Sequence, residues 1–164
     1  MAGRADVTRP HRRPKTRTMA QVGFYHLTRT APEAALPELL GKRIAAGQRA
    51  VVRCGSEARV ASLSRALWAA EKPDWLPHGS ARTGHATLQP IWITTADECP
   101  NGARFLFLLD AAEPPLEAWA RVFDLFEGHD EAAVTAARRR FAAARAAGHE
   151  LAYWKQTDRG WDKT

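Results

Sequence analysis

RFLFLLD, residues 104–110, sets five apolar residues in a row between an arginine and an aspartate. A short apolar run without polar alternation is typical of a strand that is buried on both faces, as in the centre of a parallel or mixed sheet. The run therefore predicts a central strand, and its neighbours along the chain decide what kind of sheet surrounds it.

Strands and helices alternate on both sides of this run. Ser56 is a predicted helix N-cap, and Gly148 is placed to end the last helix. Further strands are expected at 21–27, 49–54, 90–95 and 121–127, with helices at 33–46, after Ser56, and at 130–147. This order predicts an α/β fold, a single Rossmann-like domain whose mostly parallel or mixed sheet carries helices on both faces.

Two connecting segments carry weaker local signals. Residues 71–90 are expected to form a long loop. Pro114-Pro115 is expected to open a short helix that turns Leu116, Trp119 and Ala120 inward.

The basic charge of the chain is concentrated at its N-terminus. The net charge is +6, and residues 1–18 alone contribute +5 of it. We expect three parts: a basic arm at 1–18, a domain at 19–155 and a polar C-terminal tail at 156–164. The arm has two interpretations, a solvated or mis-assigned start before Met19, or an arm that binds phosphate groups.

The composition argues against several classes of protein. No apolar run reaches the length of a membrane span. Cys54 and Cys99 are too few for a disulfide framework or a thiolate metal site, and Cys54 is expected to be a buried free thiol. This usage fits a reducing cytoplasm. His78 and His85 match no common zinc spacing, so we expect no metal.

Nucleotide chemistry is also not expected. The first junction between a strand and a helix reads HLTRTAPEAAL, without a glycine, and the second, RCGSEARV, has a single glycine. Neither matches a phosphate-binding glycine loop, and Ser56 lacks the surroundings of a nucleophile. We therefore expect no cofactor and no catalytic residue.

Two tryptophans surround one end of the second helix. Val60, Leu63 and Leu67 mark its buried side, and Trp68 falls about 100° from that stripe. Trp75 follows in the next loop. Either the loop folds back and buries both rings, or the rings form a patch that binds a partner, since tryptophan is frequent among interface hot spots.

The last predicted helix combines apolar and basic residues. Phe141 belongs to its apolar stripe, and Arg138 and Arg145 lie on one shoulder of that stripe, whereas Arg139 points to solvent and Arg140 flanks the other side. Such a face is either a solvated surface or a site for the apolar end and the carboxylates of a peptide.

The chain resembles the chi subunit family of bacterial DNA polymerase III holoenzyme from about Met19 to Lys155. The resemblance rests on GFYHL, ALWA followed by WLPH, GHATLQPIWIT, NGARFLFLLD, RRRFAAARAAGHEL and YWK, in this order and spacing. It implies a non-catalytic replication adaptor that joins the psi subunit of the clamp loader to the acidic C-terminal tail of single-stranded DNA-binding protein.

The resemblance also implies roles for particular residues. Trp68 and Trp75 match the psi contact of the family, a face that a helicase could also use. Arg138, Phe141 and Phe126 match the tail-binding site. Two family lysines are replaced here, by Val134 and Ala142, and the candidates to compensate for them are Arg140, Arg145 and Lys155.

Two rival functions remain from the sequence. The basic arm would allow direct nucleic-acid binding with strong salt dependence. A nucleotide-dependent enzyme would suit the fold class, although the glycine loop is missing.

Overall fold

A computed structural model describes residues 19–73, 75–110 and 112–164, so the predicted basic arm at 1–18 lies outside the described residues. The elements, in chain order, are β1 (Gln21–Leu27), α1 (Pro32–Ala45), β2 (Ala50–Arg53), α2 (Glu57–Ala69), β3 (His78–Ser80), η1 (Ala86–Leu88), β4 (Ile91–Thr94), β5 (Phe105–Leu108), β6 (Arg121–Glu127), α3 (Glu131–Ala146), β7 (Glu150–Thr157) and β8 (Gly160–Lys163).

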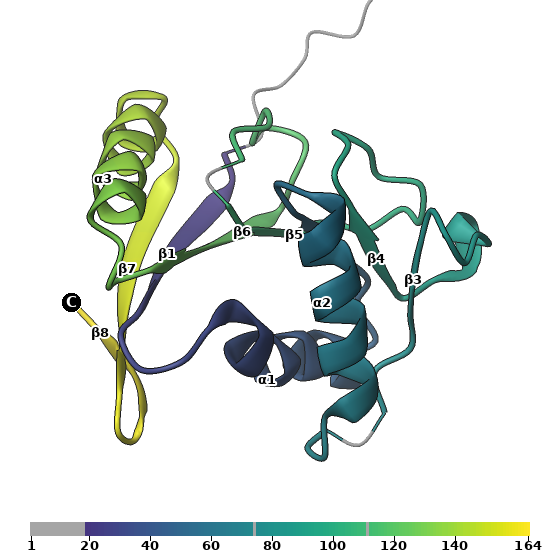
Figure 1. The fold of residues 1–164 in the computed structure, drawn as a ribbon. Coiled ribbons are helices and arrows are strands. Elements are labelled where there is room, and N and C mark those ends of the chain that lie inside the picture. Colours follow the sequence, from purple (N-terminus) through teal and green to yellow (C-terminus); the bar gives the residue numbers. More distant parts are fainter. Residues whose placement is uncertain (1–18, 74, 111) are drawn as a thin grey trace, which may run out of the picture.

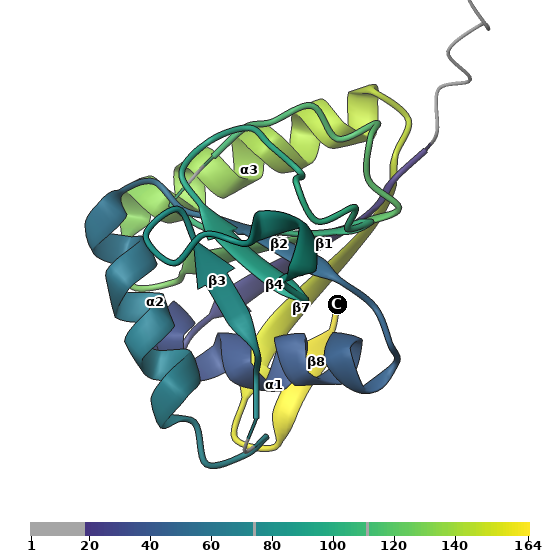
Figure 2. The same ribbon diagram turned by 90° about the vertical axis from the view of Figure 1, so that its right-hand side faces the viewer.

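The strands of the described chain form one eight-stranded sheet in the order β3-β4-β2-β5-β6-β1-β7-β8. Every neighbouring pair from β3 to β7 is parallel, and β8 pairs antiparallel with β7. Helices α1 and α2 cover one face, and α3 covers the other (Figures 1 and 2). The predicted α/β class, with its mostly parallel sheet and helices on both faces, is confirmed.

The apolar run after Arg104 is central, as predicted. Phe107 and Leu109 belong to the core under α1 and α2, whereas Leu106 and Leu108 belong to the core on the α3 side. Successive residues of a strand point to opposite faces of the sheet, and helices cover both faces, so all four side chains are buried. The same alternation in β1 places Phe24 on the α3 side and Tyr25 on the α1 side.

The helix ends follow the local sequence. The Ser56 hydroxyl accepts a hydrogen bond from the Arg59 amide at 3.2 Å, which confirms it as the N-cap of α2. Asp130 caps α3 in the same way, and Gly148 follows that helix with φ +83°, a conformation that favours glycine. Pro37 lies inside α1, beyond the first turn, where it removes one backbone donor.

The structure differs from the sequence prediction in three segments. Residues 114–120 form no helix, and the second proline of the pair disfavours helical geometry at Pro114; Trp119 is buried all the same. The expected loop at 71–90 contains β3 and η1. Residues 156–163, expected as a polar tail, complete β7 and form β8 at the sheet edge.

Cys54 is a buried free thiol, as predicted, and its burial raises the pKa of that thiol to about 12. In the described part of the chain, no helix combines the length and the hydropathy that crossing a bilayer would need.

A buried ion pair joins α3 to the sheet. Arg140 donates from Nε and Nη2 to the two carboxylate oxygens of Asp124 on β6, at 2.6 and 2.8 Å. Their side chains are only 7% and 4% exposed. A bidentate pair of this kind fixes both the position and the register of the helix over the strand.

Replacing one member of this pair leaves the other charge buried and alone. We predict that Arg140→Met lowers the free energy of unfolding by about 3–5 kcal/mol, whereas the double variant Asp124→Leu/Arg140→Met recovers most of that loss. Urea unfolding of Arg140→Met, Asp124→Leu and the double variant measures the differences. A double variant as unstable as the sum of its two single variants would contradict this account.

Candidate functional site

Trp68 and Trp75 are both exposed to solvent, and we call this pair of residues the tryptophan patch. Trp68, in the last turn of α2, is 69% exposed, and Trp75 is 71% exposed. The loop between them therefore does not bury either ring, and of the two sequence interpretations the structure supports the exposed one. Large exposed aromatic rings on a single edge of a domain are typical of a surface that binds another protein.

The buried His78 side chain packs against one ring of this patch, that of Trp68. Its ring lies 4.9 Å from the Trp68 ring, and the imidazole is buried. Nδ1 lies 2.8 Å from the Leu76 carbonyl oxygen, and Nε2 lies 3.0 Å from the Ser64 hydroxyl. The His78 ring therefore packs against one side of the Trp68 ring. Because both of its nitrogens already have hydrogen-bond partners, His78 is not free to act as a metal ligand or a base.

A second feature, the α3 cavity, lies between α3 and the sheet. It has a volume of about 310 Å³. Three residues predicted from the sequence as one site meet there: Phe126 from β6, and Arg138 and Phe141 from α3. The remaining lining residues are Phe24, Val134, Ala137 and Tyr153.

Aromatic packing gives the α3 cavity rigid walls. The Phe24 and Phe141 rings lie 5.2 Å apart in a tilted arrangement, and the Phe126 and Tyr153 rings lie 6.2 Å apart. His26 stacks on Phe126 at 5.0 Å. Rings that pack in this way lose little entropy when a further apolar group enters beside them.

The mouth of the α3 cavity is positively charged. The pKa of His26 is lowered by burial and then by the nearby charges of Lys155, His129 and Arg138. His26 Nδ1 also lies 2.6 Å from the Tyr153 hydroxyl. Neutral aromatic walls beside an exposed guanidinium can receive an apolar group together with a carboxylate.

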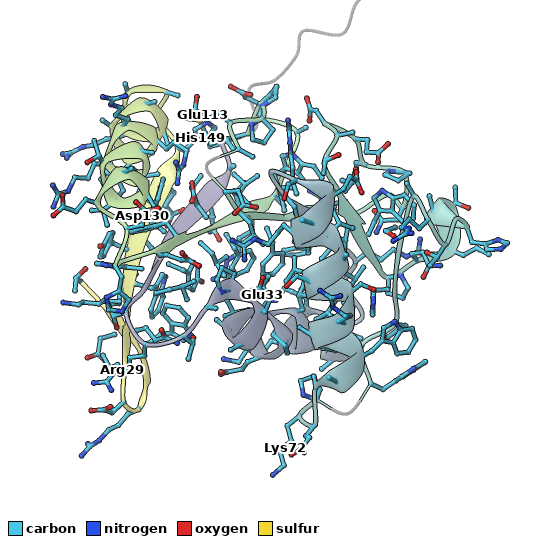
Figure 3. The ribbon with its side chains drawn as sticks, in the orientation of Figure 1. Arg29, Glu33, Lys72, Glu113, Asp130 and His149 are labelled. Atoms are coloured by element: carbon cyan, nitrogen blue, oxygen red, sulfur yellow. The ribbon has the colours of Figure 1, made fainter. Side chains whose placement is uncertain are left out.

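Arg140 and Arg145 do not join this cavity. Arg140 is buried in an ion pair with Asp124, so it does not fit the predicted role of a cation that compensates for the missing family lysines. Arg145 is exposed one turn beyond Phe141 and does not line the cavity. Figure 3 shows the course of α3 between Asp130 at its start and His149 beyond its end.

Sequence reasoning missed three residues of this region. Phe24 and His26 alternate within β1, so their shared face could have been found once that strand was oriented. Tyr153 could not be placed, because β7 was not predicted as a strand.

Over 19–73, 75–110 and 112–164, no three His, Cys, Asp or Glu side chains are grouped so that they could hold a metal ion.

Comparison with models of protein families matches residues 19–152 to the family described as DNA polymerase III chi subunit, HolC. The matched region covers most of the chain and includes both the tryptophan patch and all of the α3 cavity except Tyr153. Comparison with curated proteins gives no match. The chain therefore belongs to the DNA polymerase III chi subunit family, a family of accessory subunits in DNA replication.

Proposed function

We propose that this chain is a two-sided adaptor of the replication machinery. The tryptophan patch binds the psi subunit of the clamp loader, and the α3 cavity binds the acidic C-terminal tail of single-stranded DNA-binding protein. The observation that carries the proposal is that Phe126, Arg138 and Phe141 line one cavity, while Trp68 and Trp75 form an exposed patch on α2 and the loop after it.

The α3 cavity suits a tail that ends in proline and phenylalanine. Its volume of about 310 Å³ is at the small end of ligand sites and fits one terminal side chain. The terminal phenylalanine ring enters between Phe126 and Phe141. Arg138, at the rim of the cavity, binds the terminal carboxylate through charge-assisted hydrogen bonds.

The acidic residues that precede the end of the tail need further cations close to the α3 cavity. Arg145 is exposed on this helix, and Lys155 is exposed on β7 near the mouth of the cavity. Both replace the family lysines that are absent at Val134 and Ala142. Exposed ion pairs of this kind are screened by salt, so tail binding weakens as the ionic strength rises.

The tryptophan patch suits an apolar partner surface. Its two rings together supply the type of anchor that dominates interface energies. The same face is also open to a helicase, which would then compete with psi. In this arrangement the protein works in the cytoplasm at the replisome and reaches the coated template mainly through single-stranded DNA-binding protein.

Arg138→Ala is predicted to weaken binding of a labelled acidic peptide that ends in Ile-Pro-Phe by roughly tenfold, the loss expected for one charge-assisted contact. Fluorescence anisotropy with the full chain at low and moderate salt measures it. Arg139→Ala is the matched control, because Arg139 is the exposed neighbour that does not line the cavity. Equal losses in both variants would show that only net charge matters and would reject the site.

Trp68→Ala and Trp75→Ala are each predicted to weaken psi binding by about 30-fold or more, as for an interface hot spot, without changing peptide binding. Leu88→Ala serves as the control, since Leu88 is also 70% exposed but lies outside the patch. Calorimetry with psi and anisotropy with the peptide give the two readouts. Loss of both activities together would contradict separate surfaces.

A further inference from the structure

A third feature, which we call the basic aromatic cavity, lies on the opposite face of the sheet from the α3 cavity. It has a volume of about 420 Å³ and is bordered by α1, by strands β1 and β6 and by the β7–β8 hairpin. Figures 1 and 2 show this hairpin beside α1, with α3 on the far side of the sheet. The residues that line the basic aromatic cavity are Tyr25, Glu38, Leu39, Lys42, Arg43, Arg121, Phe123, Trp154, Arg159, Gly160 and Trp161.

The charge of this cavity is strongly positive. Four cationic side chains line it against a single acid, Glu38, which is paired with Lys42 at 3.3 Å. Arg43 and Arg121 form no ion pair with any residue that the structure describes. Both guanidinium groups are half-buried and lie over the Phe123 ring, so their charges are stabilised by aromatic contact and water and stay available to an anion.

One donor of the Arg43 guanidinium group is left without an acceptor. Its Nε is buried and has no hydrogen-bond partner among the described residues. The pKa of Arg43 is lowered by burial and then by the charge of Arg121. An anion between these two arginines would relieve the repulsion between their charges and accept hydrogen bonds from their outer guanidinium nitrogens.

Aromatic rings surround the two arginines. Trp154 and Trp161 are half-buried, and the Tyr25 ring lies 6.2 Å from the first and 5.1 Å from the second. The Arg121 guanidinium lies 4.6 Å from the Phe123 ring centroid. The cavity therefore offers an anion site and a set of aromatic surfaces within one small volume.

This surface continues along the sheet toward the start of β1. Arg121 and Trp154 also line a neighbouring groove, together with Lys163, the acidic Glu150 and two small residues, Gly23 and Ala152. The Lys163 ammonium lies 5.8 Å from the Trp154 ring. The Tyr25 ring fills the space above Gly23, where a Cβ would lie 2.8 Å from a ring carbon, so the aromatic surface of the cavity extends into this groove.

We propose that the basic aromatic cavity and the adjoining groove bind single-stranded nucleic acid. A phosphate group accepts hydrogen bonds from Arg43 and Arg121, and a neighbouring base packs against Trp154 or Trp161. Interleaved cations and aromatic rings are the usual means by which proteins hold single strands without reading their sequence. An acidic peptide would use the cations but would leave the aromatic surfaces without a matching group.

This contact is independent of the proposed tail and psi contacts. Phe24 and Tyr153 line the α3 cavity, whereas Tyr25 and Trp154, the next residues along the same strands, line the basic aromatic cavity. Strand alternation thus separates the two sites by the thickness of the sheet. The protein could bind bare template and the tail of a coating protein at the same time.

The test uses the full chain and a fluorescein-labelled oligothymidylate of about ten nucleotides, within the usual range of single-strand site sizes. Arg43→Gln and Arg121→Gln are each predicted to weaken binding roughly tenfold. Each is also predicted to reduce the slope of log affinity against log salt by about 0.7, the value for one lost phosphate contact on a single strand. Arg82→Gln, an exposed arginine outside the cavity, is the matched control for net charge.

Two further arms identify the ligand. Free thymidine monophosphate is added as a competitor. Displacement of the oligonucleotide at a competitor concentration equal to that of the binding sites would show that the cavity binds a single nucleotide and not a strand, which overturns the proposal. A labelled glutamate-rich peptide that binds more tightly than the oligonucleotide, and is lost in Arg43→Gln, would overturn it in favour of an acidic protein. Losses no larger than in Arg82→Gln would place binding elsewhere, including residues 1–18.

A crosslinking experiment on the unaltered chain covers the case in which a variant fails to fold. An oligonucleotide that carries 5-iodouracil is photo-crosslinked, and the modified peptides are mapped by mass spectrometry. Crosslinks within 21–27 or 150–163 are expected. Crosslinks confined to residues 1–18, or to α3, would overturn the proposal.

Discussion

The buried pair between Arg140 and Asp124 positions α3, and the α3 cavity depends on that position. Because the pair is bidentate and almost fully buried, it permits one register of the helix over β6. Phe126 lies two residues beyond Asp124 and so shares its face of the strand. Arg138 and Phe141 flank Arg140 in the helix, and the pair therefore brings all three cavity residues together.

The parallel sheet separates the surfaces that this register creates. Each strand sends alternate residues to opposite sides, so neighbouring residues of β1 and β7 serve different cavities. The tryptophan patch is a third surface, at the end of α2 and in the loop after it. An adaptor needs this arrangement, because partners that bind separate faces do not exclude one another and can be held by one small domain.

The sequence predicted the central strands and the helices well, because buried apolar runs, the Ser56 cap and Gly148 are local signals. It failed where tertiary contacts decide: β7 and β8 are rich in polar and aromatic residues and are strands only because they pair with β1 and with each other. The prediction for Arg140 was wrong for the same reason, since helical periodicity cannot show that Asp124 lies opposite this arginine. Phe126, Arg138 and Phe141 were found through resemblance, and the fold explains why they meet.

The most direct test of the adaptor account is a nuclear magnetic resonance titration of the isotope-labelled chain with the acidic peptide that ends in Ile-Pro-Phe. The account predicts that the largest chemical shift changes fall on the residues that line the α3 cavity, while the indole signals of Trp68 and Trp75 stay in place. Changes centred on Arg43 and Arg121, or on the tryptophan patch, would contradict it, because the tail would then occupy a surface assigned to another partner.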